Sequence, residues 1–291
     1  MLEEYAEFCY DQIGNLVLEY TEYFEDLRPQ LDKASIDVSL PEYVSMIFFT
    51  GGTAFIFSLF ILGSLFALMM GLPGVIIGLT VSIVASVGSV MGFYLYPSVV
   101  ISSRASKIRD TLPFAAMYMA TLSGTGTSTS EMFSILARQD EEYGEVAKEA
   151  EKISRDIETF GMDVSEALKR AADRTPSKDF KELMWGINHT ITSGGSLRAF
   201  LQERSRTLMS DYQRRVESFA EELSLLVEMY ITVVIVGSIV FTSISAVISS
   251  FTSFSADKIV LIQVVAIFIG LPMISGMFIL LVRGMAPGGI R

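Results

Sequence analysis

The sequence lacks charged residues over three long stretches. No Asp, Glu, Lys or Arg occurs in residues 43–103, 229–256 or 259–282. A helix of about 20 apolar residues crosses the hydrocarbon core of a bilayer, so the first stretch is long enough for two crossings and each of the others for one. Gly71-Leu72-Pro73-Gly74 interrupts the first stretch with residues that favour a tight turn. The sequence therefore predicts four transmembrane helices.

Cysteine and histidine occur once each, which removes the usual ligands and nucleophiles of several enzyme classes. Cys9 has no partner for an internal disulfide bridge. His189 has no Cys or second His near it in the sequence, so a zinc site is not expected there. No nucleophile-elbow sequence accompanies this His, which disfavours a serine hydrolase. We therefore expect no catalytic residue, no metal and no cofactor.

Basic residues are concentrated in one segment of the chain. Residues 104–226 hold 17 of the 22 Lys and Arg, whereas the first 43 residues hold only two. Because basic loops stay on the cytoplasmic side of a membrane, this segment and both termini are expected in the cytoplasm. The first apolar run starts after more than forty mostly polar residues, which does not fit a signal peptide. The net charge of −11 argues against nucleic acid as a partner.

The N-terminal region has apolar side chains at helical spacing among many acids. Helices that lie on a membrane surface usually present Lys and Arg to the lipid headgroups, so we expect this acidic region to pack on protein. The sequence thus predicts five segments: an N-terminal amphipathic acidic region (1–42), transmembrane helices one and two (43–103), a cytoplasmic helical bundle (104–226), transmembrane helices three and four (227–284) and a cytoplasmic tail (285–291).

The segment 104–226 shows helical periodicity and no strand pattern, which predicts about six helices. Pro113 suits the first turn of a helix, and residues 114–122 are apolar on nearly every side, as in a buried helix. A further helix is expected over residues 141–160. The predicted fold is therefore all-α, with four transmembrane helices and a cytoplasmic six-helix bundle inserted between the second and the third.

The joints between these helices repeat a pattern in which a glycine precedes a capping residue. A Gly can adopt the left-handed conformation that ends one helix. Shortly after it, a Ser or Asp can cap the next helix, and a Glu three positions further on can reach back to the cap. The residues of the three expected joints are Gly126, Ser128 and Glu131, then Gly161, Asp163 and Glu166, and finally Gly194, Gly195 and Ser196, where the Glu is missing.

Gly194 and Gly195 admit a second interpretation, because a glycine pair flanked by hydroxylic residues can cradle a phosphate. A P-loop needs a glycine loop after a strand, followed by Lys and then Ser or Thr. Here the pair follows a helical pattern and precedes Ser196 and Leu197. The sequence therefore favours a helix joint over a nucleotide site.

The predicted transmembrane helices carry small residues at intervals that let helix backbones approach closely in lipid. These residues could pack the four helices against one another or form a subunit interface. None of the four helices has a charged residue near its middle, which disfavours transport through a relay of buried ionisable groups. The small residues are Gly74, Gly78, Ser82, Ser86, Gly88 and Gly92.

Two joints and the order of the segments carry a family resemblance. Residues 161–168 read Gly-Met-Asp-Val-Ser-Glu-Ala-Leu, a Gly-Gly joint precedes a long helix, and two pairs of transmembrane helices bracket the bundle. This layout resembles the type II secretion system F domain family over about residues 30–285. Leu31-Asp32-Lys33-Ala34 and Pro41-Glu42-Tyr43-Val44-Ser45 look like the lead-in of archaeal and Tad-type members.

The resemblance implies a platform protein of type II secretion, type IV pili, Tad pili or archaella, with no catalysis of its own. In that family the cytoplasmic bundle docks on a hexameric secretion ATPase, and the membrane helices contact pilin subunits. Longer archaeal members carry two such modules, so this chain, with one, is expected to work as a dimer with itself or with a sister chain. A channel or transporter, or a membrane-bound enzyme, is the alternative.

The resemblance also makes basic residues of the bundle candidates for contact with the ATPase, although a solvated helix face is the alternative for each of them. Bacterial members often carry Gly-Glu-x-Ser-Gly-x-Leu at the second joint. This chain has Thr192 or Ser193 where the acid would be, so a role of that carboxylate, including metal binding, does not carry over. The candidates for ATPase contact are Arg138, Lys148, Lys152, Arg155, Lys169, Arg170 and Arg174.

Overall fold

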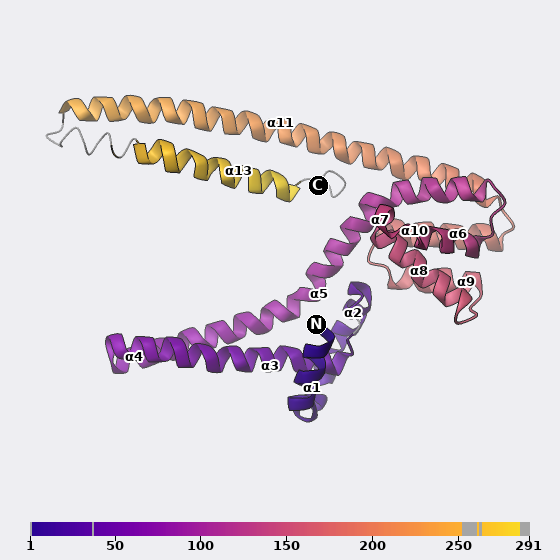
Figure 1. The fold of residues 1–291 in the computed structure, drawn as a ribbon, viewed down its shortest axis with the longest axis horizontal. Coiled ribbons are helices and arrows are strands. Elements are labelled where there is room, and N and C mark those ends of the chain that lie inside the picture. Colours follow the sequence, from indigo (N-terminus) through magenta and orange to yellow (C-terminus); the bar gives the residue numbers. More distant parts are fainter. Residues whose placement is uncertain (1, 37, 252–260, 262–263, 286–291) are drawn as a thin grey trace. The chain divides into compact units, whose positions relative to one another are not determined.

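The computed structural model describes residues 2–36, 38–251, 261 and 264–285. Every regular element in these ranges is a helix, so the predicted all-α fold is confirmed for this part of the chain (Figure 1). The chain divides into two compact units, residues 1–202 and 203–291, which we describe separately. Four of the described helices are long and apolar enough to cross a membrane, as predicted.

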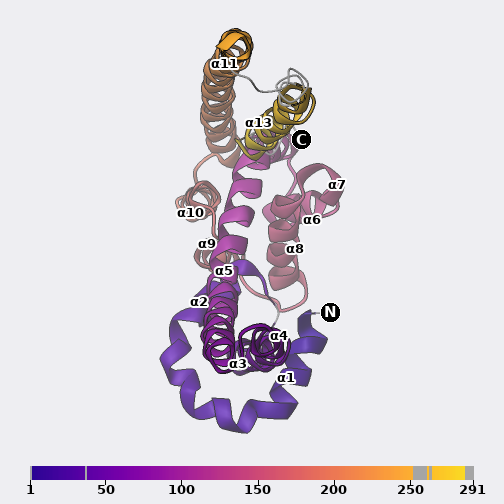
Figure 2. The same ribbon diagram turned by 90° about the vertical axis from the view of Figure 1, so that its left-hand side faces the viewer.

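The N-terminal region curves around the start of the first membrane helix (Figure 2). Helix α1 (Leu2–Val17) and the 3-10 segment η1 (Leu18–Leu27) pack against α3 (Leu40–Ser58). Helix α2 (Arg28–Ala34) packs against η1 and against α5 (Leu72–Ser123). The expectation that this acidic region packs on protein is therefore confirmed. The core of the cluster consists of Ala6, Cys9, Val17, Leu27, Leu31, Leu40, Tyr43, Val44, Met46 and Ile47.

The first membrane hairpin begins with α3, whose N-terminus is fixed by Ser39: its backbone N–H donates to Oε2 of Glu42 at 2.9 Å. A π-helical turn η2 (Leu59–Gly63) and helix α4 (Ser64–Met70) complete the first crossing. The chain reverses at Gly71, whose φ of 67° suits a residue without Cβ. It then returns along α3 and α4 as helix α5 (Leu72–Ser123).

Helix α5 runs from the membrane hairpin into the bundle without an interruption, and it contains both Pro97 and Pro113. The expectation that Pro113 opens a new helix is wrong. A proline in the first turn of a helix and a proline inside a helix look alike in sequence. Here Leu112 and Ala115, on either side of Pro113, are fully buried, and their packing stabilises a continuous helix. Figure 1 shows that α5 bends along its course, as prolines within a helix favour.

The bundle of the first unit is built from the end of α5, five further helices and the first residues of α11. The helix expected over 141–160 is divided at Gly144, whose φ is 47°, and the count of six helices is not confirmed. The five helices are α6 (Thr129–Ala137), the single turn α7 (Asp140–Tyr143), α8 (Glu145–Glu158), α9 (Val164–Arg174) and α10 (Lys178–Thr192).

Helix α5 is buried on one face only within the bundle. Ala115, Ala116 and Met119 are fully or almost fully covered, whereas Phe114 and Met117 are 43% and 47% exposed. The expectation that residues 114–122 are buried on nearly every side is therefore wrong. Apolar composition alone does not distinguish a buried helix from one that leaves an apolar stripe on the surface.

The second unit contains most of α11 (Leu197–Phe251), the π-helical turn η3 (Ala266–Gly270) and α13 (Leu271–Met285). Tyr230 joins the two long helices: its ring stacks on Phe278 with centroids 4.5 Å apart, and its hydroxyl lies 2.7 Å from Oγ of Ser275. The expected C-terminal tail, except for Met285, lies outside the described residues.

Candidate functional site

The first charged residue after the second membrane helix is Arg104, and its side chain is buried between three helices. Its Nε donates to Oε2 of Glu145 at 2.8 Å, and its Nη2 donates to Oε1 of Glu149 at 2.8 Å. Its Nη1 donates to the backbone carbonyl of Lys33. Arg104 thus ties together the end of α2, the start of the bundle on α5, and the first two turns of α8.

The same carboxylates extend the network to α9. Oε2 of Glu149 lies 3.5 Å from Nε of Arg174, and Oδ2 of Asp156 accepts a hydrogen bond from Nη1 of Arg174 at 3.0 Å. Glu149 and Asp156 are almost fully buried. Burying a carboxylate costs free energy of folding unless it is paired with a cation. The two arginines supply these cations. We call this set, Arg104 with Glu145, Glu149, Asp156 and Arg174, the Arg104 cluster.

Glu145 lies at the edge of the Arg104 cluster, and its carboxyl group stays ionised at a lower pH than a glutamate in water does. Burial by itself raises the pKa of its carboxyl group. Hydrogen bonds and charge attraction from Arg104 and Lys148 outweigh burial, so the pKa of Glu145 is lowered from its ordinary value of 4.5. The carboxylate is therefore a fixed negative charge at neutral pH.

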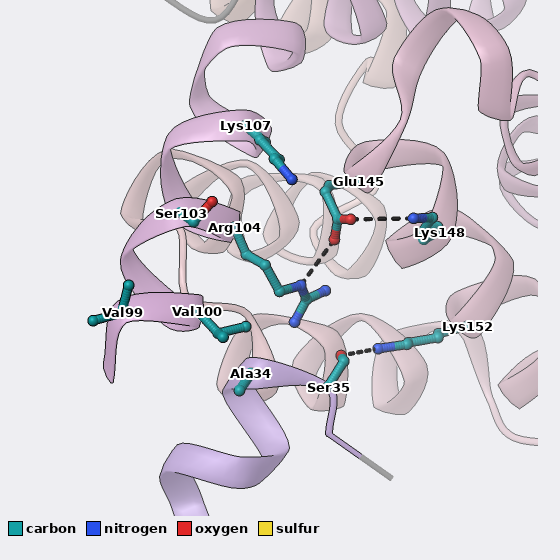
Figure 3. Close-up of a pocket in the computed structure, with 10 residues that line it drawn as sticks. All are labelled: Ala34, Ser35, Val99, Val100, Ser103, Arg104, Lys107, Glu145, Lys148 and Lys152. Atoms are coloured by element: carbon teal, nitrogen blue, oxygen red, sulfur yellow. Dashed lines mark hydrogen bonds and ion pairs between the residues drawn. The ribbon is translucent and has the colours of Figure 1, made fainter. Parts of the chain in front are cut away.

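A pocket of about 530 Å³ opens beside the Arg104 cluster (Figure 3). Its walls come from the end of α2, from α5 just beyond the second membrane helix, and from α8. Figure 3 shows the ammonium groups of Lys148 and Lys152 directed toward Glu145 and Ser35, with Arg104 in the centre. The lining residues are Ala34, Ser35, Val99, Val100, Ser103, Arg104, Lys107, Glu145, Lys148 and Lys152.

The predicted ATPase-contact residues fall into two groups. Four of them take part in ion pairs within the bundle: Lys148 with Glu145, Lys152 with Glu149, and both Arg170 and Arg174 with Asp156. The other three, Arg138, Arg155 and Lys169, are exposed and make no ion pair with a described residue. The sequence pattern did not distinguish these groups, because the pairing partners lie on other turns or other helices.

The first two predicted joints have the expected glycine and cap. Gly126 and Gly161 have φ angles of 83° and 65°, the left-handed conformation that ends a helix. Oγ of Ser128 accepts from the N–H of Glu131 at 3.2 Å, and Oδ2 of Asp163 accepts from the N–H of Ser165 at 2.9 Å. Among the described hydrogen bonds, the expected reach-back of the Glu131 and Glu166 side chains is not observed.

The glycine pair is also a helix joint. Gly194 has a φ of 70° and ends α10, and Oγ of Ser196 accepts from the N–H of Ala199 at 3.3 Å at the start of α11. Gly195 follows without a left-handed φ. His189 is exposed near the end of α10. Within the described residues, no group of three or more His, Cys, Asp and Glu side chains could hold a metal ion.

The small residues of the second membrane helix divide between two faces. A Cβ on Gly78 would lie 2.6 Å from Cα of Gly63, and Oγ of Ser86 donates to the carbonyl of Gly51 at 3.0 Å. Gly74, Gly78 and Ser82 are buried in the hairpin. In contrast, a Cβ on Gly88 or Gly92 would meet no described atom within 4 Å. Gly74, Gly78 and Ser82 therefore pack against the first membrane helix, whereas Gly88 and Gly92 lie on a face of α5 that no described residue covers.

Residues 115–244 match the protein family described as "Type II secretion system (T2SS), protein F". We call these matched residues, 115–244, the protein F domain. The domain runs from the buried face of α5 through the glycine joints into the membrane portion of α11. Glu145, Glu149, Asp156 and Arg174 lie inside the matched residues, whereas Arg104 and the N-terminal region precede them. The Arg104 cluster therefore fastens the protein F domain to segments outside it.

Curated relatives of this chain come from methanogenic archaea. It is 30% identical over 137 residues to Flagella accessory protein J of Methanocaldococcus jannaschii, covering 47% of this chain and 24% of the relative. It is 26% identical over 156 residues to the protein of the same name in Methanococcus voltae, covering 54% and 28%.

An uncharacterized protein of Methanocaldococcus jannaschii is 28% identical over 200 residues, covering 66% of this chain and 33% of that relative. The chain therefore spans a third or less of the length of these relatives. No solved structure matches the chain.

Proposed function

We propose that the chain is a membrane platform that couples a separate hexameric secretion ATPase to the assembly of a type IV filament or of a type II secretion machine. The observation that carries the proposal is the match of residues 115–244 to protein F, a stretch that begins in the bundle portion of α5 and ends in the third of four helices that can cross a membrane. The similarity to two proteins named Flagella accessory protein J supports an archaellum-like filament.

The protein F domain serves as the part on which the ATPase acts, and α5 carries the displacement into the membrane. Helix α5 has 52 residues, which at 1.5 Å per residue corresponds to about 78 Å. Its bundle portion is fixed to α8 and α9 through the Arg104 cluster. A force applied to α8 or α9 is thus passed to the second membrane helix, beside which pilin-like subunits leave the bilayer.

Exposed basic side chains of the bundle form the contact with the ATPase. Arg155 on α8 and Lys169 on α9 are exposed, and α8 packs against α9. Arg138 and Arg170 belong to the same candidate set. Arg174 is less suited to direct contact, because its side chain is only 19% exposed and is paired with Asp156 and Glu149. The chain supplies positioning and mechanical coupling, and the ATPase supplies the chemistry.

The chain is placed in the cytoplasmic membrane, with both termini and residues 104–226 in the cytoplasm. The 17 basic residues of that segment support this orientation. The chain acts as a dimer, with itself or with a sister chain. Gly88 and Gly92, which the described chain leaves open, support a close helix contact between subunits. A purely monomeric mass in native lipid particles would contradict the dimer.

A pull-down of the full chain with its secretion ATPase tests the docking face. Arg155→Glu and Lys169→Glu are expected to weaken retention of the ATPase, because each reverses an exposed charge. Lys178→Glu, at the exposed start of α10, is the matched control outside the candidate set and should retain the ATPase. Unchanged binding by both test variants would show that Arg155 and Lys169 do not contact the ATPase. Loss of binding in the control would show that the ATPase responds to the net charge of the bundle and not to these two residues.

A further inference from the structure

The pocket beside the Arg104 cluster combines features of a site for an anion. Four basic residues line it, Arg104, Lys107, Lys148 and Lys152, together with one acid, Glu145. Glu149 lies directly behind Arg104 and contributes a second negative charge. The lining residues together with Glu149 therefore carry four positive and two negative charges, a surplus of two positive charges.

Three nitrogens of Arg104 donate to protein oxygens, whereas the lysines of the pocket keep donors that the described residues do not use. Arg104 directs its Nε, Nη1 and Nη2 to protein oxygens. Each lysine ammonium has three hydrogen-bond donors. Lys148 uses one on Glu145 at 3.2 Å with its side chain 53% exposed, and Lys152 contacts Ser35 and Glu149. No described side chain pairs with the ammonium group of Lys107. Several cationic donors are thus available to one ligand.

The position of the pocket along α5 places it at the level of lipid headgroups. Tyr94 and Tyr96 are exposed on α5, and aromatic residues of this kind mark the membrane–water interface. Val99 follows Tyr96 by three residues, or about 4.5 Å along the helix. The headgroup layer extends roughly 5–7 Å beyond the hydrocarbon core on each side. The pocket therefore begins in that layer at Val99. Lys107 lies about 12 Å further along α5, and its long side chain can reach back toward the headgroups because helical side chains point toward the N-terminal, membrane end of the helix.

The walls of the pocket match the two halves of a phospholipid. Val99 is 65% exposed and Val100 is partly exposed, so the membrane end offers apolar contacts to an acyl or isoprenoid chain. Lys107, Lys148 and Lys152 lie farther from the membrane and offer donors to a phosphate. Basic pockets at the membrane boundary between helices are suited to anionic lipid headgroups. A freely dissolved phosphate would use only the basic half.

We propose that this pocket binds the phosphate headgroup of an anionic membrane lipid, held by Lys107, Lys148 and Lys152 and oriented by Val99 and Val100. The pocket is walled by the end of α2, by α5 and by α8, the same three helices that Arg104 joins. The site depends only on the membrane boundary, so it does not require the proposed docking of an ATPase.

Native mass spectrometry of the full chain, purified in detergent and titrated with phosphatidylglycerol or phosphatidylcholine, tests the proposal. The wild-type chain should bind the anionic lipid at least roughly tenfold more tightly. Lys107→Gln/Lys148→Gln removes two charges from the pocket and should weaken phosphatidylglycerol binding by roughly 30-fold. Lys169→Gln/Lys178→Gln removes two exposed charges elsewhere on the bundle and should leave binding unchanged.

Two results would overturn the proposal: equal affinity for both lipids in the wild type, or equal phosphatidylglycerol affinity in the two double variants. Lys107→Gln alone provides the comparison if Lys148→Gln perturbs folding, because the ammonium group of Lys107 has no described partner. Inorganic phosphate in excess distinguishes the sources of the ligand. Retention of phosphatidylglycerol supports a lipid site, whereas its displacement by inorganic phosphate would assign the pocket to a dissolved anion instead.

Discussion

Nη2 of Arg104 lies 2.8 Å from Oε1 of Glu149, and both side chains are buried. The two residues are 45 positions apart in the sequence and belong to different helices. Arg104 sits where the second membrane helix enters the bundle, and Glu149 sits on α8 inside the protein F domain. This pair is therefore a direct link between the membrane hairpin and the domain on which we propose the ATPase acts.

Removal of Arg104 should destabilise the bundle strongly. Arg104→Met leaves Glu149 buried without one of its cationic partners, and loss of one partner of a buried ion pair costs about 3–5 kcal/mol. Arg155, which is exposed on α8, is the control, and Arg155→Met should change stability by less than about 0.5 kcal/mol. Thermal unfolding in lipid nanodiscs measures both. Similar melting of the two variants would show that the pair contributes little.

Acidification should weaken the same junction through Glu145. The pKa of Glu145 is lower in the folded chain than its ordinary value of 4.5, so its stabilisation is present above pH 4.5 and is lost as the pH falls through the folded pKa. Wild type should exceed Glu145→Gln in unfolding free energy at neutral pH, and the difference should shrink below pH 4.5. Glu151→Gln, on the exposed face of α8, is the control. A difference that grows on acidification would contradict the assignment.

Cys9 should react slowly with thiol reagents as long as the N-terminal region is packed on α3. The side chain is fully buried, and burial raises the pKa of its thiol, which lowers the thiolate fraction. Because Cys9 is the only cysteine in the chain, maleimide labelling reports on this contact alone. Labelling of the folded chain should be at least roughly tenfold slower than that of the denatured chain.

Leu27→Ala opens a cavity in the same apolar cluster and should accelerate the labelling of Cys9, since such truncations cost about 2–5 kcal/mol. Tyr23→Ala removes a side chain that is 82% exposed and serves as the control. Rapid labelling of the unmodified folded chain would mean that the N-terminal region does not stay packed on α3.

Two glycines of the second membrane helix should respond differently to the same substitution. A Cβ at Gly78 would lie 2.6 Å from the backbone of Gly63, whereas a Cβ at Gly88 meets no described atom within 4 Å. Gly78→Ala should therefore cost about 1–3 kcal/mol by overpacking, and Gly88→Ala should leave the stability of a single chain unchanged. Thermal unfolding checks both, and equal effects would contradict the close contact between the two membrane helices.

Much of the architecture follows from short-range patterns in the sequence. The four membrane helices were predictable because charge-free runs long enough to cross a bilayer have few alternatives. The joints at Gly126, Gly161 and Gly194 were predictable because a left-handed glycine and a following cap are local features. The cap at Ser39 was overlooked, although Glu42 at the third following position is the usual signal for it.

Features that depend on tertiary contacts were not predictable from one sequence. Pro113 has the same appearance at the start and in the middle of a helix, and only the buried neighbours of α5 decide between the two. The partners of Arg104 and Arg174 lie on other helices, so spacing along the chain does not reveal them. Lys148 and Lys152 therefore looked like part of a solvated face, whereas they line the pocket beside Arg104.

Binding of the purified secretion ATPase to the full chain in lipid nanodiscs, followed together with ATP turnover, tests the platform role most directly. The chain alone should hydrolyse no ATP, and the ATPase should bind it saturably through the segment 104–226. Arg155→Glu should weaken that binding while Lys178→Glu leaves it intact. ATP turnover by the chain alone, or an ATPase that does not bind the folded chain at all, would contradict the account.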